Sequence, residues 1–154
     1  MIQRIQSIYL LIAVILVGML YFFPFASFVV EQDMSMYHIS IKGLLPDISD
    51  AKPIFRVIPL IFIISTSILA LLSAIMLFKR RMLQIRICII SILALLGLQG
   101  LMLYFISVSK HQLGAVSSFS IVFVFPIIAA ILSYLAIRGI AKDEALVRSM
   151  DRLR

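Results

Sequence analysis

Four uninterrupted apolar runs, each free of Asp, Glu, Lys and Arg, alternate with more polar segments along the 154-residue chain. They cover approximately residues 5–23, 57–78, 87–108 and 119–137. Each run has about 19 to 22 residues, which at 1.5 Å per helical residue crosses the roughly 30 Å hydrocarbon layer of a bilayer. Because lipid offers no hydrogen bonds, the backbone of such a run has to form a helix. The pattern therefore predicts an all-α membrane protein with a four-helix transmembrane bundle.

The longest polar segment, residues 24–56, separates the first two runs and predicts an outer loop with a strand pair. Residues 37–42 alternate apolar and polar side chains, which is the two-residue period of a half-buried strand. Residues 25–30 are rich in aromatic and β-branched residues, and residues 31–35 between them are polar enough to turn. We expect a small antiparallel β-hairpin that lies over the bundle, since a lone hairpin is marginal in water.

The carboxyl-terminal segment, residues 138–154, has the pattern of an amphipathic helix. Leu146, Met150 and Leu153 recur at helical spacing, and Glu144 stands four residues before Arg148. We expect the fourth helix to continue past the membrane into this tail, or to bend at Gly139. A further bend is predicted at Pro126, which lies well inside the fourth run.

The distribution of basic residues predicts the orientation. Arg4, residues 79–86 and residues 138–154 hold ten of the fourteen Lys and Arg residues, and all three segments fall on one side of the membrane. The positive-inside bias places this side, with both termini, in the cytoplasm. The same bias accounts for the net charge of +7. Nucleic-acid binding is therefore not expected, because no aromatic-rich basic platform or reading helix accompanies the charge.

Residues suited to cofactor or metal chemistry are sparse, so no cofactor is expected. Cys88 is the chain's single cysteine and lies in an apolar run, where it suits packing. His38 and His111 lie in different loops and lack the further ligands that a zinc site needs. The four runs contain no carboxylate, His or basic residue of the kind that carries proton relays. No nucleophile–base pair is visible, so neither an enzyme nor a small-molecule substrate is expected.

Small residues at helical spacing predict close contacts between the membrane helices, because helices in lipid associate through packing and not through water exclusion. Gln99 is the most polar side chain near mid-membrane and needs a partner on a neighbouring helix or backbone. We favour packing within the bundle over packing against another protein. The residues of this prediction are Thr66, Ala70, Ala74, Ser91, Ala94, Gly97, Gly100 and Gln99.

The two ends of the chain carry its most specific motifs, MIQRIQSIYLL at residues 1–11 and KDEALVRSMDRLR at residues 142–154. With these motifs the chain resembles, over essentially its whole length, a four-span membrane family of Gram-negative bacteria catalogued as domain of unknown function 4293. The resemblance implies an inner-membrane location and carries over no catalytic residue. Both motifs fall on the predicted cytoplasmic face, which suits a surface for a partner or for assembly.

The favoured function is an accessory or structural subunit of a larger membrane complex, with anionic lipids and other membrane proteins as partners. A small oligomeric channel or carrier, with Gln99, Ser91 and the Pro126 bend along its path, is the alternative. A lipid-modifying enzyme is the third hypothesis, with Asp143, Glu144 and Asp151 as its acids. The residues predicted to contact a partner or lipid are Arg4, Arg80, Arg81, Asp143, Glu144, Arg148, Asp151, Arg152 and Arg154.

Overall fold

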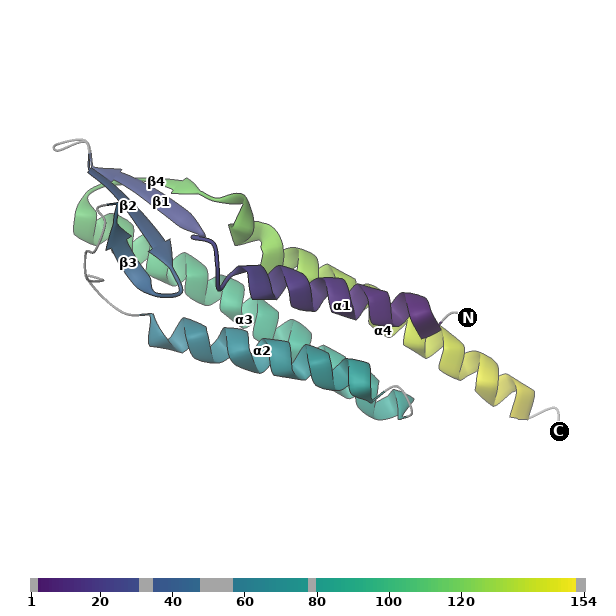
Figure 1. The fold of residues 1–154 in the computed structure, drawn as a ribbon. Coiled ribbons are helices and arrows are strands. Elements are labelled where there is room, and N and C mark those ends of the chain that lie inside the picture. The colour runs from purple at the N-terminus through teal and green to yellow at the C-terminus, as the bar shows by residue number, and fades with distance from the viewer. Residues whose placement is uncertain (1–2, 31–34, 48–56, 78–79, 152–154) are drawn as a thin grey trace.

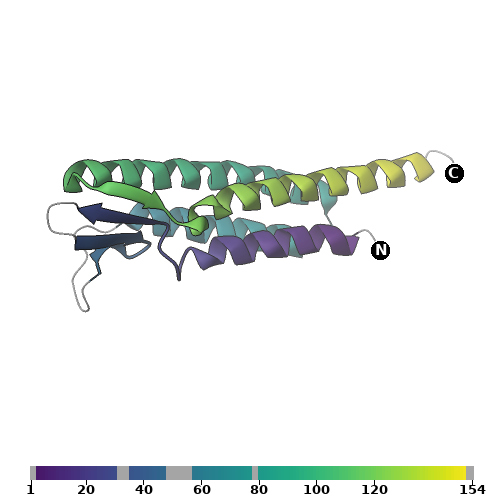
Figure 2. The same cartoon turned by 90° about the horizontal axis from the view of Figure 1, so that it is seen from above.

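Four helices form an elongated bundle in the computed structural model, which describes residues 3–30, 35–47, 57–77 and 80–151. Among these, side chains are described for residues 5–145. The helices are α1 (Gln3–Met19), α2 (Ile58–Met76), α3 (Arg81–Leu113) and α4 (Phe125–Asp151). Helix α1 packs against α2 and α4, and α3 packs against the same two neighbours. Both termini lie at one end of the bundle, here called the tail end, and a small sheet lies at the other, the sheet end (Figure 1, Figure 2).

Three of these helices are long and apolar enough to cross a membrane, over Ile58–Met76, Arg81–Leu113 and Ile121–Ala145. The apolar part of α1, Ile5–Met19, is shorter. Large apolar side chains point outward from all four helices, as expected for a surface that faces lipid. They include Ile8, Leu11, Ile15, Phe62, Leu69, Met76, Leu93, Leu96, Ile131 and Tyr134. The chain is thus a multi-pass membrane protein by helix length and hydropathy.

The first helix ends earlier than the predicted range 5–23. At its end, hydrogen bonds to the carbonyl three residues earlier replace the helical bonds to the carbonyl four residues earlier. Leu20 N–H donates to Val17 O at 3.2 Å, and Tyr21 N–H donates to Gly18 O at 3.1 Å. Hydropathy alone could not place this end, because residues 20–23 are apolar as well. The Tyr21 hydroxyl lies 2.6 Å from Ser65 Oγ, which fixes the turn to α2.

The other helices depart from the predicted runs mainly at their ends. Helix α2 closely matches the expected 57–78, and its Pro59 stands in the first turn, where a missing N–H does not matter. Helix α3 has 33 residues, about 50 Å at the helical rise, because charged residues at both ends of the predicted 87–108 are helical too. Its C-cap, Gly114, has φ 57, a left-handed conformation that suits glycine.

The fourth helix was predicted to start at residue 119, and this is wrong. Residues Val116–Phe119 form a strand, Ile121–Val124 form a 3₁₀ helix, and α4 begins at Phe125. Pro126 is therefore at the start of α4, where proline is tolerated, and the predicted mid-helix bend is absent. From there α4 continues without a break through Gly139 to Asp151, so the tail 138–154 extends the fourth helix over its described part.

The sheet end holds a four-stranded antiparallel sheet in place of the predicted hairpin. Strands β1 (Ala26–Val30) and β2 (Ser35–Ser40) confirm the expected pair. Strand β3 (Gly43–Pro46) adds to one side of β2, and β4 (Val116–Phe119) pairs with the free edge of β1, giving the order β3-β2-β1-β4. The fold is therefore mostly helical with a small sheet, and the all-α prediction needs this correction. The rest of the predicted outer loop, residues 48–56, lies outside the described residues.

One face of the sheet is buried against the bundle. Ala26, Phe28, Ile39 and Leu44 are fully buried on it, in the alternating pattern that a one-sided sheet requires. Strands β1 and β4 contact α3, whose extra length beneath the sheet provides the support that a small sheet needs (Figure 1).

Candidate interaction site at the tail end

A hydrogen bond between the first and last helices fixes the tail end. Gln6 Nε2 of α1 donates to Asp143 Oδ2 of α4 at 2.7 Å. The Gln6 side chain is only 5% exposed, so its amide needs this partner. Two residues that belong to the two terminal motifs are thereby brought together, and the contact was not predicted.

Gly139 makes this hydrogen bond possible. A Cβ built on Gly139 would meet Gln6 Cγ at 3.0 Å and Gln6 Nε2 at 3.1 Å. Gly139 lies one helical turn before Asp143, so the Gln6 side chain crosses the bare backbone of α4 to reach the carboxylate. The glycine predicted as a possible bend is instead a site of close approach.

An ion pair joins α3 to α4 next to this contact. Arg81 Nη1 lies 3.7 Å from Glu144 Oε2, with about a quarter of each side chain exposed. The distance is too long for a hydrogen bond, and Arg81 Nη1 is buried with no hydrogen-bond partner among the described residues. Asp143 and Glu144, predicted to contact a partner or lipid, therefore both make contacts inside the bundle.

The exposed charges described at the tail end are all positive. Arg80, Arg86, Arg138 and Lys142 are exposed, while the two described acids of this end contact Gln6 and Arg81. Beyond these contacts α4 continues, and its last turns project past the start of α1 (Figure 2). Arg4, Arg148 and Asp151 have helical backbones whose side chains lie outside the described part, and Arg152 and Arg154 lie wholly outside it.

The predicted packing residues divide between the interior and the surface. Ala74, Ser91 and Gln99 are buried, and Ala70 and Ala94 are half-buried. Thr66, Gly97 and Gly100 are exposed, and a Cβ at either glycine would meet no atom within 4 Å. The reason is geometric. In α3 each three-residue step from Ser91 to Gly100 falls about 60° short of a full helical turn, and in α2 each four-residue step from Thr66 to Ala74 goes about 40° beyond one, so both stripes move around the helix between inside and outside.

Polar side chains in the bundle interior are mostly satisfied by their own helix. Ser67, Ser91, Ser109 and Ser133 are buried, and each donates its hydroxyl to the carbonyl four residues earlier at 2.7–2.9 Å. Such serines act as small packing residues and do not line a polar path. Gln99 differs, because its Oε1 is buried without a hydrogen-bond partner among the described residues.

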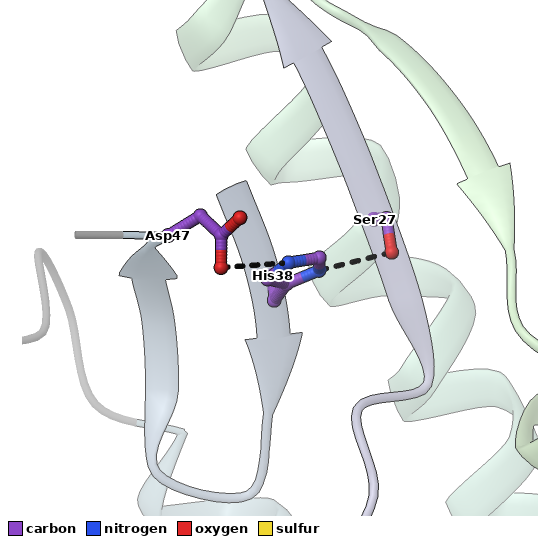
Figure 3. A network of polar contacts seen from close by, with 3 residues as sticks. All are labelled: Ser27, His38 and Asp47. Carbon is purple, nitrogen blue, oxygen red and sulfur yellow. Dashed lines mark hydrogen bonds and ion pairs between the residues drawn. The ribbon is translucent and has the colours of Figure 1, made fainter. Parts of the chain in front are cut away.

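A second polar network lies on the outward face of the sheet (Figure 3). His38 Nδ1 is 3.0 Å from Ser27 Oγ, and His38 Nε2 is 3.4 Å from Asp47 Oδ1. Ser27 and His38 are directly opposite each other in the β1–β2 register. Sequence reasoning missed this network, although aligning the two predicted strands would have placed the two residues face to face.

The surroundings of Ser27 do not suit nucleophilic catalysis by this network. A serine nucleophile needs donors aimed at the oxyanion that forms beside it. Ser27 stands in β1, which has β2 on one side and β4 on the other, so its neighbouring backbone N–H groups belong to the ladders. The network therefore links β1, β2 and the residue that follows β3. This set of contacts is called the cross-strand latch. Within the described residues, no group of three His, Cys, Asp or Glu side chains could hold a metal ion.

Comparison with known proteins identifies the family of the chain. The family model described as "Domain of unknown function (DUF4293)" matches residues 2–153, which is nearly the whole chain. A search of the curated proteins found no match.

Proposed function

We propose that this chain, which belongs to the DUF4293 family, is a non-enzymatic accessory or structural subunit of a larger complex in the bacterial inner membrane. The observation that carries the proposal is the projecting end of α4. Helix α4 has 27 residues, about 40 Å at the helical rise, and exceeds the roughly 30 Å hydrocarbon layer. A helix that leaves the membrane as a rigid extension offers a surface to a partner protein.

The two interhelical contacts at the tail end support this role. Asp143 and Glu144 tie α4 to α1 and α3 at the level where its free part begins. The projecting turns therefore start from a fixed position, which lowers the entropy lost when a partner binds. The two terminal motifs of the chain would thus have two tasks. Gln6 and Asp143 would hold the bundle together, and the residues after 145 would contact the partner.

The proposed orientation places both termini in the cytoplasm. Exposed Arg80, Arg86, Arg138 and Lys142 at the tail end support it through the positive-inside bias, and they also suit anionic lipid head groups. This orientation requires α1 to cross the membrane. Its 17 residues span about 26 Å, and the apolar residues 20–23 that follow the helix make up the rest of the roughly 30 Å layer.

The test is purification of the tagged full-length protein from its native membrane in a mild detergent. We expect one membrane protein to co-purify in a fixed ratio. Replacing residues 146–154 by a Gly/Ser segment of equal length should release it, while Met36→Ala, at an exposed position on the sheet, should retain it. A chain that emerges alone and monomeric, or a partner that remains bound without the tail, would contradict the proposal.

A further inference from the structure

A pocket of about 400 Å³ lies at the sheet end, between the connection from α1 to β1 and the strands β2 and β3. Tyr21, Phe22 and Pro24 line it from the connection, and His38, Ser40 and Lys42 line it from β2 and the following turn. Leu45 and Pro46 complete the lining, so the pocket is mainly apolar with one polar side. Neither the proposed subunit role nor the tail end involves it.

The polar side of the pocket carries positive charge. Lys42 is exposed, and no ion pair joins its ammonium group to another described residue. Its backbone N–H donates to Ser40 Oγ at 3.3 Å, which helps to fix the turn. His38 also lines the pocket. Its side chain is held in place by contacts with Ser27 and Asp47 (Figure 3). Among the described residues that line the pocket, Lys42 carries the one full charge, and Asp47 beside them pairs with His38. The Lys42 ammonium group therefore favours an anion.

The apolar side of the pocket lies at the depth of the lipid interface. The apolar part of α1, Ile5–Met19, spans only about 23 Å, so a layer of roughly 30 Å beginning at Ile5 ends near Phe22 and Phe23. Phe22 is 82% exposed and Phe23 is 51% exposed, which suits contact with acyl chains. Lys42, on the other side of the pocket, then lies at the depth of the lipid head groups, where long basic side chains place their charge.

We propose that this pocket binds an anionic phospholipid of the leaflet at the sheet end. The Lys42 ammonium group pairs with the lipid phosphate, the Ser40 hydroxyl borders the head group, and the acyl chains lie against Phe22. A single basic residue near the membrane surface contributes about fivefold to the affinity for an acidic lipid. The preference for an acidic over a zwitterionic lipid should therefore be of that order.

The chain contains no tryptophan, so Phe22→Trp provides a single fluorescent reporter at the pocket. The variant is reconstituted into phosphatidylcholine vesicles that contain an equal, small fraction of either brominated phosphatidylglycerol or brominated phosphatidylcholine. We expect stronger quenching by the brominated phosphatidylglycerol. Adding Lys42→Gln should reduce the preference about fivefold, to near unity, and Lys42→Arg should restore it. Lys110→Gln, an exposed lysine at the same end that does not line this pocket, should leave it unchanged.

Equal quenching of the single-tryptophan protein by the two lipids would overturn the proposal, whatever the Lys42 variants do. Persistence of the preference in the folded Lys42→Gln variant would overturn it as well. Sodium phosphate, compared with sodium chloride at equal ionic strength, separates the two sources of a phosphate group. We expect the preference to persist in phosphate. Its loss only in phosphate would mean that the free anion occupies the pocket in preference to the lipid head group, which would overturn the lipid as the occupant.

Discussion

Replacing Gly139 by alanine tests whether the contact between Gln6 and Asp143 holds the two ends of the chain together. The added methyl group would meet the Gln6 side chain at 3.0–3.1 Å, so Gln6 has to shift by a few tenths of an ångström, which disturbs its hydrogen bond to Asp143. Gly18, in the last turn of α1, is the control, because it is also helical and a Cβ there would meet nothing within 4 Å. The two substitutions are chemically identical, and only the one at Gly139 meets another side chain.

The expected magnitudes follow from two opposing effects. Alanine in place of glycine inside a helix stabilises the fold by about 0.5–1 kcal/mol, and Gly18→Ala should show this gain. At Gly139 the same gain is opposed by the loss of a hydrogen bond to a carboxylate, about 1.5 kcal/mol for a half-buried acceptor. Gly139→Ala should therefore leave the protein about 1–2 kcal/mol less stable than Gly18→Ala.

The buried thiol of Cys88 serves as the readout, since the rate at which a maleimide labels it reports how often the bundle opens. The variants are compared in the same detergent over a series of sodium dodecyl sulfate concentrations. In a Gln6→Ala background the obstructing side chain is gone, so Gly139→Ala should become as stabilising as Gly18→Ala. The reasoning is refuted if Gly139→Ala equals Gly18→Ala in the wild-type background, or if Gln6→Ala leaves their difference intact.

Three further outcomes follow from the structure. Glu144→Gln should lower the free energy of unfolding by about 1 kcal/mol. Arg81→Met should cost less, because it also removes the Nη1 atom that is buried without a hydrogen-bond partner among the described residues. An equal or larger loss for Arg81→Met in the labelling assay would contradict this. Cys88 should react with a maleimide only as fast as the native chain opens, and rapid labelling before denaturation would show that its burial is wrong. His38→Ala should lower stability by about 1 kcal/mol through the loss of the cross-strand latch. Ser27→Ala should show a smaller loss, and two neutral variants would exclude the latch.

Hydropathy identified the apolar part of every helix. The errors in the predicted ends of the helices have specific physical causes. The ends of α3 were missed because Arg81, Arg86 and Lys110 interrupt an apolar run without interrupting a helix. The end of α1 was missed for the opposite reason, since Phe22 and Phe23 are apolar but lie beyond the helix. The length of an apolar run indicates how much of the chain can face lipid. The ends of the helix depend on backbone hydrogen bonds and capping residues.

The candidate site was predicted less completely because it depends on pairs that are far apart in the sequence. Asp143 and Glu144 were identified from the terminal motif, but nothing local indicates that one meets Gln6 and the other Arg81. Strand β4 has only four residues, and its strand conformation depends on pairing with β1. Ser27 and His38, by contrast, follow from the register of a hairpin that the sequence did predict.

The pairing of β1 with β4 determines when the sheet can be completed during synthesis of the chain. Val29 pairs with Val116, which is translated 87 residues later, and at 5–20 residues per second this is a delay of roughly 4–17 s. During that interval one edge of β1 has no strand beside it, although α2 and α3 are already being inserted into the bilayer. The sheet can therefore close only after α3 has been synthesised, because β4 follows α3 in the chain and has to reach β1.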